Sequence, residues 1–245
     1  MEVIEDLVAE QERLEAILAG LSQEQWLTES AAAGWTVADV VLHLAHGEES
    51  VVATASVGAP PSGLTTGIEP GDVDGAMNRL VEQERTTPEA TFERWRAARR
   101  AAVDALRAAD PAVPVLWVAM QLKPRTLATT RLAEHWAHAL DIATPLGVPL
   151  PDTDRLRHVA WLAHATLPYA FAVAGEPAQP VFCDLTAPDG SSWQFGAPDA
   201  GSTISGDAGA FCRVGAQRLA PEASGLVTTG PHAATALRVI RTYAA

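Results

Sequence analysis

Two short windows of the sequence contain four of its seven histidines, and one of the windows also holds a glutamate. His43 and His46 lie in the first window, and Glu134, His135 and His138 lie in the second. Glu134 and His138 are four residues apart, so on a helix both side chains project from one face, about one turn apart. A carboxylate and an imidazole in that arrangement can bind one divalent metal ion. The interiors of helical bundles commonly build metal sites from such pairs and a ligand on a facing helix.

The predicted third ligand is His43, provided that its helix is a neighbour of the helix carrying Glu134. Spacing also leaves two other histidines to consider as ligands. His46 could face the same cavity as a supporting or proton-transfer group, and His135 is expected to be rotated away and partly solvated. Glu-x-x-x-His spacings also occur on solvated helix faces, and a lone histidine among apolar residues is often structural. Spacing alone does not separate these interpretations.

The nature of the three ligands limits the chemistry. Two histidines and one glutamate are typical of catalytic zinc, which keeps a fourth coordination position open for water or substrate. Non-haem iron uses a similar set, and nickel and manganese remain open as well. We therefore expect zinc to be the bound metal, with iron, nickel and manganese as alternatives.

The elements that must position these residues are helical. Apolar spacing and capping residues predict helices over residues 2–20, 37–53, 87–109 and 126–143, and a fifth from about 152 to 171. The glycine- and proline-rich stretch 57–70 predicts a long connection that could act as a lid.

The character of the sequence changes after Gly175-Glu176-Pro177. Strands are expected at 181–186, 192–195 and 226–229, and helices at 207–218 and 232–244. The prediction is a helical bundle (1–174) followed by a small α+β domain (178–245).

Composition excludes several classes of protein. The chain has 245 residues, 48% of them hydrophobic, and a formal net charge of -13, so it would repel nucleic acid. It lacks an apolar run of the roughly 20 residues that span a bilayer, and its acidic start is unlike a secretory signal. Two isolated cysteines, Cys183 and Cys212, suit a reducing compartment. We expect a cytoplasmic protein without nucleic-acid or membrane partners, either a monomer or a small homo-oligomer.

Two runs of residues resemble a known family. GWTVADVVLHLA at 34–45 and EHWAHALD at 134–141 are similar to the DinB-like superfamily, and within it to the mycothiol-dependent maleylpyruvate isomerase branch. The resemblance implies a four-helix bundle whose metal ligands are His43, Glu134 and His138, and so selects His43 over His46. It also implies a small C-terminal α/β domain like that of sterol-carrier proteins. The LTAPDG run at 185–190 is closer still to an uncharacterised metal-binding subgroup of the superfamily.

The resemblance also points to an arginine. In the isomerase branch, an arginine on the helix after a Val-Ser-Gly-like turn reaches back to the active site. Here Ile204-Ser205-Gly206 precedes a predicted helix that ends at Arg218. Arg218 is therefore the candidate anchor for a substrate carboxylate, because its guanidinium suits bidentate pairing. The alternative is a solvated arginine that complements the helix dipole.

The expected function is that of a metal-dependent isomerase or S-transferase that activates mycothiol against a small acidic substrate, with Arg218 and His46 as catalytic candidates. One alternative is an enzyme that uses the ion as a Lewis acid without a thiol, as an isomerase, cyclase or hydrolase. Another is a non-catalytic protein that binds a metal and a small molecule.

Overall fold

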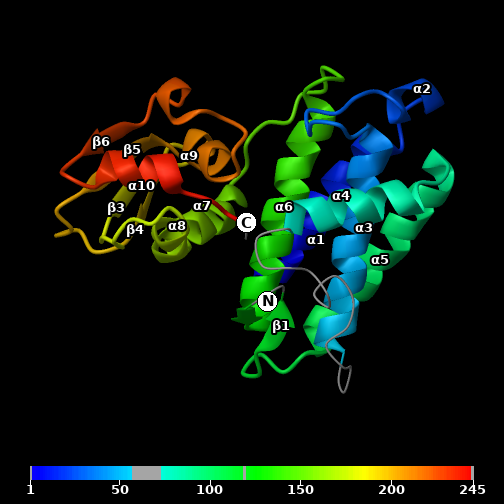
Figure 1. The fold of residues 1–245 in the computed structure, drawn as a ribbon, viewed down its shortest axis with the longest axis horizontal. Coiled ribbons are helices and arrows are strands. Elements are labelled where there is room, and N and C mark those ends of the chain that lie inside the picture. Colours follow the sequence, from blue (N-terminus) through cyan, green and yellow to red (C-terminus); the bar gives the residue numbers. More distant parts are fainter. Residues whose placement is uncertain (1, 57–72, 118–119, 244–245) are drawn as a thin grey trace. The chain divides into compact units, whose positions relative to one another are not determined.

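The computed structural model describes residues 2–56, 73–117 and 120–243, and its internal contacts divide the chain into two compact units. The first unit ends at Leu150 and the second comprises Pro151–Tyr243 (Figure 1). The sequence analysis drew its boundary later, between residues 174 and 178. The difference arises because two helices over residues 156–173 pack with elements of the second unit. The composition break at Gly175 is thus a turn inside that unit.

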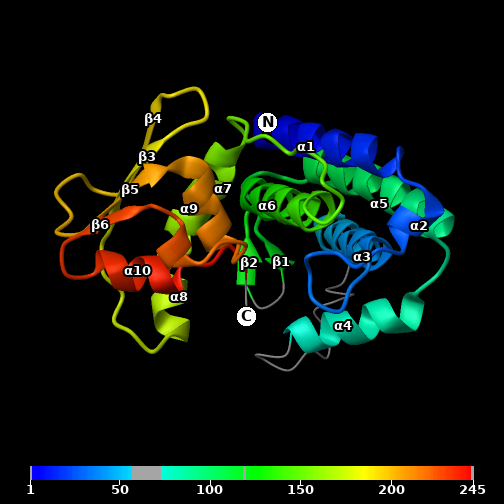
Figure 2. The same ribbon diagram turned by 90° about the horizontal axis from the view of Figure 1, so that it is seen from above.

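Four long helices form the bundle of the first unit, as predicted. They are α1 (Glu2–Leu18), α3 (Val37–Ala55), α5 (Pro88–Ala108) and α6 (Pro124–Ala143). Helices α1 and α3 each pack against both α5 and α6, which closes a four-helix arrangement (Figure 2). Buried apolar side chains from all four helices, Trp95 and Trp136 the largest among them, fill the centre.

Local sequence signals set where these helices begin. Thr36 and Asp39 form a capping box at the start of α3. The Thr36 hydroxyl accepts a hydrogen bond from the main-chain amide of Asp39, and the Asp39 carboxylate accepts one from the main-chain amide of Thr36. Helix α5 has Thr87 as its cap and Pro88 in its first turn. These caps fix the start of α3, and therefore the position of His43 two turns further on.

Shorter elements complete the first unit. They are α2 (Gln23–Trp26), α4 (Val73–Glu84), and an antiparallel pair formed by β1 (Val115–Trp117) and β2 (Met120–Leu122). Helix α4, which the sequence analysis did not predict, crosses α3 on the side away from α1 (Figures 1 and 2). Arg85, just after α4, pairs with Asp39 at 2.8 Å and ties the end of α4 to the start of α3. The predicted lid, 57–70, lies outside the described residues.

The second unit is a mixed sheet with helices. Its elements are α7 (Leu156–Ala165), α8 (Leu167–Val173), β3 (Phe182–Thr186), β4 (Ser192–Phe195), β5 (Thr203–Asp207), α9 (Ala208–Gly215), a short 3-10 helix (Pro221–Ala223), β6 (Val227–Thr229) and α10 (Ala233–Val239). The strand order is β4-β3-β5-β6, with β3 parallel to β5 and the other two pairs antiparallel. The fold class expected from the sequence, a helical bundle followed by a small α/β domain, is confirmed.

Several boundaries in this unit differ from the predictions. The single helix predicted to reach Phe171 is two helices that meet at Thr166, with Pro168 in the first turn of α8. The sequence analysis missed strand β5, because its Ser205 and Gly206 suggest a turn. Helix α9 ends at Gly215 and α10 at Val239, both earlier than predicted. Within the described residues, no helix is both long enough and apolar enough to span a membrane.

Candidate metal centre

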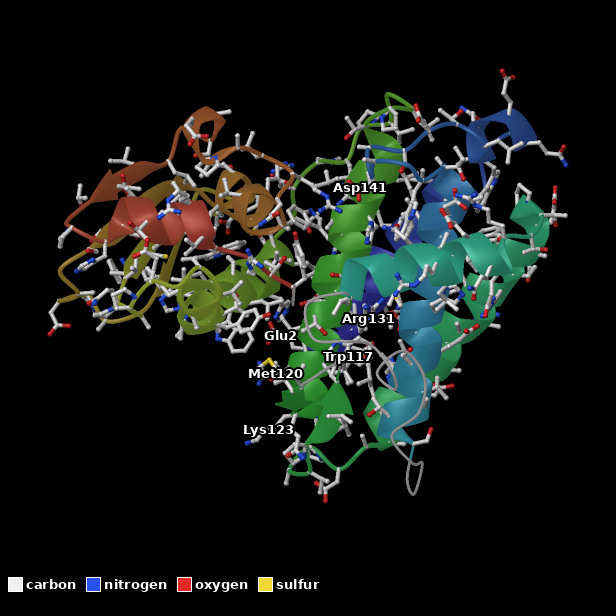
Figure 3. All side chains as sticks on the ribbon, viewed as in Figure 1. Glu2, Trp117, Met120, Lys123, Arg131 and Asp141 are labelled. Carbon is white, nitrogen blue, oxygen red and sulfur yellow. The ribbon has the colours of Figure 1, made fainter. Side chains whose placement is uncertain are left out.

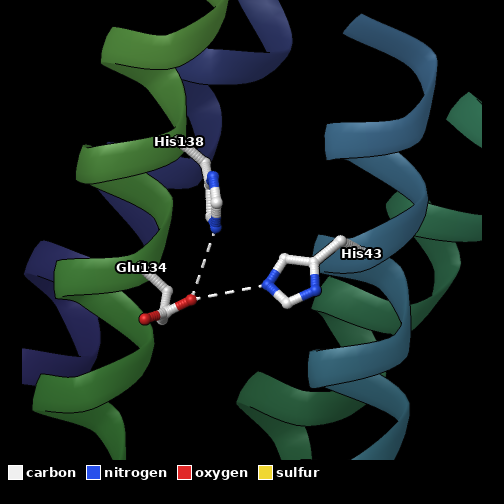
Figure 4. Close-up of side chains that lie close together, drawn as sticks. All are labelled: His43, Glu134 and His138. Atoms are coloured by element: carbon white, nitrogen blue, oxygen red, sulfur yellow. Dashed lines mark ion pairs between the residues drawn. The ribbon is translucent and has the colours of Figure 1, made fainter. Parts of the chain in front are cut away.

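The structure brings the three predicted metal ligands together between α3 and α6 (Figure 4). Glu134 Oε2 lies 3.6 Å from His43 Nε2 and 3.5 Å from His138 Nε2, and the three ligand atoms all lie within 4.8 Å of one another. Both distances exceed those of ordinary hydrogen bonds. Bonds of about 2.0–2.2 Å to a tetrahedral zinc ion place its ligand atoms about 3.3–3.6 Å apart. The two separations around Glu134 Oε2 therefore fit two edges of a tetrahedral site, and the third pair of ligand atoms lies within 4.8 Å.

The protonation states of His43 and Glu134 also fit metal binding. Burial lowers the pKa of His43 to about 4, although the Glu134 carboxylate opposes this shift. Burial alone would raise the pKa of Glu134, but the imidazoles of His138 and His43 hold it well below its usual range. At neutral pH, His43 thus offers a lone pair and Glu134 a negative charge.

His138 is held by a second carboxylate. Its Nδ1 lies 2.9 Å from Asp141 Oδ2, and Asp141 follows it on the same helix by three residues. Burial disfavours the charged imidazole, but the carboxylates of Asp141 and Glu134 outweigh burial and raise the pKa of His138. When Nδ1 donates its proton to Asp141, the Nε2 lone pair points toward Glu134, as in the carboxylate–histidine–metal triads of metalloproteins. The sequence analysis missed Asp141, although its spacing from His138 was visible.

An aromatic ring covers the two imidazoles. The ring centroid of Trp35 lies 5.0 Å from that of His43 and 6.4 Å from that of His138. The imidazoles themselves meet edge to face at 4.9 Å. The side chains of His43, Glu134 and His138 keep 16%, 26% and 10% of their surface exposed, so the cluster is covered but not sealed.

His46 is not part of this cluster in the described structure. Its Nε2 lies 3.0 Å from Glu84 Oε2 at the end of α4, and Arg94 holds the same carboxylate oxygen at 2.6 Å. Burial lowers the pKa of His46 despite the neighbouring Glu84. These contacts link α3, α4 and α5, so His46 helps to hold the three helices together. Its predicted role in proton transfer stays a prediction.

His135 differs from its prediction, because it is fully buried rather than partly solvated. Its Nε2 accepts a hydrogen bond from Trp95 Nε1 at 3.2 Å, and its Nδ1 lies 2.9 Å from the main-chain oxygen of Arg131. The indole can only donate and the carbonyl can only accept, so His135 is a neutral imidazole protonated on Nδ1. Burial accordingly lowers its pKa to about 3. Both nitrogens are engaged, so His135 is a core residue.

A buried ion pair lies one helical turn before Glu134. Arg131 Nε donates to Glu48 Oε1 at 2.8 Å, and both side chains are almost completely enclosed. Figure 3 shows Arg131 and Asp141 at two levels of α6, and Glu134 and His138 lie between them in the sequence. A Cβ atom at position 47 would collide with the guanidinium, so Gly47 is required for this approach. Composition and spacing gave no signal for this pair.

Arg218 lies in the second unit, three residues after the end of α9. Its main-chain amide donates to the Arg213 oxygen at 2.8 Å, and its Nη1 donates to the Ala216 oxygen at 2.7 Å. Gln217 before it adopts a left-handed backbone with φ of 59°. Arg218 is therefore held by the turn that closes α9 rather than by the helix itself, and its predicted role stays a prediction.

Fold and site together define a four-helix-bundle protein with a candidate His/Glu/His metal centre and a small α/β unit. Residues 7–143 match the family model described as the mycothiol maleylpyruvate isomerase N-terminal domain. The chain belongs to this family, within the DinB-like superfamily.

Relatives and solved structures agree with this assignment. An uncharacterised protein of Mycobacterium tuberculosis, found in strains CDC 1551 and H37Rv, is 30% identical over 243 residues, which are 98% of this chain and 95% of the relative. The crystal structure of the mycothiol-dependent maleylpyruvate isomerase superposes with a TM-score of 0.63 at 15% identity. A histidine-to-alanine mutant of that enzyme gives the same score at 14% identity. Both matches cover 93% of this chain and 92% of the other, which shows a shared fold.

Proposed function

We propose that the protein is a metal-dependent enzyme of the mycothiol-dependent isomerase or S-transferase type. His43, Glu134 and His138 would hold one divalent ion, with zinc expected first and iron, nickel or manganese as alternatives. The observation that carries the proposal is the pair of 3.5 and 3.6 Å separations around Glu134 Oε2, which match a tetrahedral site and are too long for hydrogen bonds.

The number of ligands favours catalysis over a structural role. The described residues supply three ligand atoms to the cluster, whereas structural zinc sites usually have four protein ligands. The side chains of His43 and Glu134 keep 16% and 26% of their surface exposed, so the cluster is not closed to solvent. A divalent ion with an open position lowers the pKa of a bound thiol, so that a thiolate is available at neutral pH.

The family assignment supports mycothiol as the thiol that the ion would bind. The solved relative is a mycothiol-dependent isomerase, and the family model carries mycothiol in its description. When bound, mycothiol would supply a thiolate nucleophile suited either to reversible addition to an activated double bond, as cis–trans isomerisation requires, or to displacement of a leaving group, as S-transfer requires.

The chain's own residues would hold and orient the reactants. Asp141 fixes the ring of His138, and burial keeps His43 neutral at neutral pH. Arg218 is the proposed anchor for a substrate carboxylate, needed because the net charge of -13 disfavours anions. Its replacement by alanine is expected to raise KM for an acidic substrate and to leave the metal content unchanged.

Cobalt substitution tests the proposal. The protein is loaded with Co²⁺, and its visible and near-ultraviolet absorption is recorded during titration with mycothiol. We expect a sulfur-to-cobalt charge-transfer band to appear with saturating behaviour. S-methyl mycothiol, which lacks a free thiol, is the control and should produce no such band. An unchanged spectrum at saturating mycothiol would contradict a thiol enzyme, and would favour the alternative in which the ion activates a carbonyl or water.

A further inference from the structure

The two imidazoles of the metal centre are supported in different ways. His138 Nδ1 has a hydrogen-bond partner, the Asp141 carboxylate at 2.9 Å. His43 Nδ1 is buried, and it has no hydrogen-bond partner among the described residues. Metal-binding histidines usually donate their second nitrogen to a carboxylate, a carbonyl or water, which fixes the orientation of the ring. Among the described residues, the His43 ring is therefore oriented by contacts other than a hydrogen bond at Nδ1.

Trp35 is the group packed against that ring. Its ring centroid lies 5.0 Å from that of His43 with an angle of 42° between the planes, and 6.4 Å from that of His138 with an angle of 31°. Both distances lie within the range of attractive aromatic pairs. A metal-bound imidazole is poorer in electrons than a free one, so its attraction to the face of an indole ring increases when an ion binds.

The loop before α3 holds Trp35 firmly. The main-chain oxygen of Trp35 accepts hydrogen bonds from the Ser30 amide at 2.9 Å and from the Ser30 hydroxyl at 2.8 Å, and its amide donates to the Ala32 oxygen at 3.1 Å. A bridge between Glu29 and Thr36 closes the loop immediately before α3 begins. The indole is thus placed by its own backbone and by the start of α3.

The same loop is joined to the helix that carries the other two ligands. The amide of Ala31 donates to the main-chain oxygen of Asp141 at 2.9 Å. Asp141 therefore supports His138 through its carboxylate and the Trp35 loop through its backbone. The loop over residues 28–36 and the last turn of α6 are thus hydrogen-bonded to each other, and each contacts one of the two imidazoles.

We propose that Trp35 is a positioning residue of the metal centre, which orients the His43 imidazole as Asp141 orients that of His138. The inference rests on the proposed metal site and adds a determinant of its affinity and geometry. Loss of the indole should weaken metal binding by roughly two- to tenfold, the range that the energies of aromatic pairs imply. It should also change the ligand field, because His43 would be free to rotate.

The first test compares Trp35→Leu with Trp35→Phe, which retains an aromatic face. Zinc affinity is measured by chelator competition, and the d–d bands of the cobalt protein report the geometry. Trp35→Leu should bind zinc two- to tenfold more weakly with shifted cobalt bands, and Trp35→Phe should restore most of both. Trp161→Leu, which removes an exposed tryptophan from the second unit, is the matched control. Unchanged affinity and bands in Trp35→Leu would overturn the proposal.

A second readout covers the case in which Trp35→Leu does not fold. Co²⁺ quenches the fluorescence of a nearby indole, so Trp35→Phe should lose a quenched component that the wild-type protein shows. Equal fractional quenching in the two proteins would overturn the placement of Trp35 beside the metal-binding imidazoles. Absence of zinc binding by the wild-type protein would instead contradict the metal centre itself, and with it the role of Trp35. Failure of the site and failure of the inference are thus distinguishable.

Discussion

His138 Nδ1 and Asp141 Oδ2 lie 2.9 Å apart within one turn of α6, and this contact turns the free nitrogen of His138 toward Glu134. It sets the tautomer and the ring orientation of a ligand, which is the usual task of groups behind a metal-binding histidine. The metal centre thus has supports as well as ligands.

Asp141→Asn should therefore weaken metal binding without removing a ligand. The amide keeps the shape of the side chain but loses the charge that fixes the imidazole, and comparable changes cost about 10- to 100-fold in affinity. Chelator competition for zinc measures the effect. Asp104→Asn makes the same exchange at an exposed position of α5, and its affinity should equal that of the wild type. Equal affinities for both variants would show that Asp141 has no such role.

Metal affinity should depend on pH through His138. Its pKa is raised above the ordinary value of about 6.5, so a proton competes with the ion near neutral pH. His43, with a pKa of about 4, does not compete in this range. The apparent affinity should therefore rise as the pH increases through neutrality and should level off only above the raised pKa of His138, with release of a proton on binding. Calorimetric titrations in buffers of different ionisation enthalpy measure that proton, and a flat profile would contradict the assignment.

The stability of the metal-free protein should show the opposite trend. A raised pKa in the folded state means that protonated His138 stabilises the fold below the unfolded pKa of about 6.5. That contribution is lost as the pH rises through the folded pKa. Urea unfolding of the metal-free protein at several pH values therefore provides an independent check of the same group.

Removal of one member of the Glu48–Arg131 pair should destabilise the bundle strongly. Both side chains are enclosed, and Glu48→Ala would leave the guanidinium without its partner at 2.8 Å. Breaking such a buried pair costs about 3–5 kcal/mol, whereas apolar replacement of both partners is often close to neutral. Urea unfolding should show a large loss for Glu48→Ala and a smaller one for the double variant Glu48→Leu/Arg131→Met. Similar losses in both would indicate that packing, rather than the charge left behind, dominates.

The sequence was informative where local signals determine structure. The Thr36 cap, the Thr87-Pro88 start and the helical apolar spacing placed the four bundle helices, and the Glu134–His138 spacing located the candidate metal centre. Spacing could not choose between His43 and His46, because side chains three residues apart on a helix point only about 60° apart around its axis. The choice of His43 came from the resemblance.

Features that depend on tertiary contacts were beyond the sequence. Helix α4 is polar on average and is fixed by Glu84, which pairs with His46 in α3 and Arg94 in α5, and by Arg85, which pairs with Asp39 in α3. The sequence analysis gave Trp35 no role of its own, because its position beside the two imidazoles depends on the packing of its loop against α6. The enclosed Arg131 requires the missing side chain at Gly47, and only the packing of α3 on α6 reveals that requirement.

The most direct test of the metal centre is the metal content of purified His43→Ala and His46→Ala proteins, measured by atomic emission beside the wild type. The two histidines are three residues apart, but His43 lies 3.6 Å from Glu134 and His46 bonds to Glu84. We predict one equivalent of metal per chain in the wild type and in His46→Ala, and little or none in His43→Ala. Metal retained by His43→Ala, or absent from the wild type after metal loading, would contradict the site.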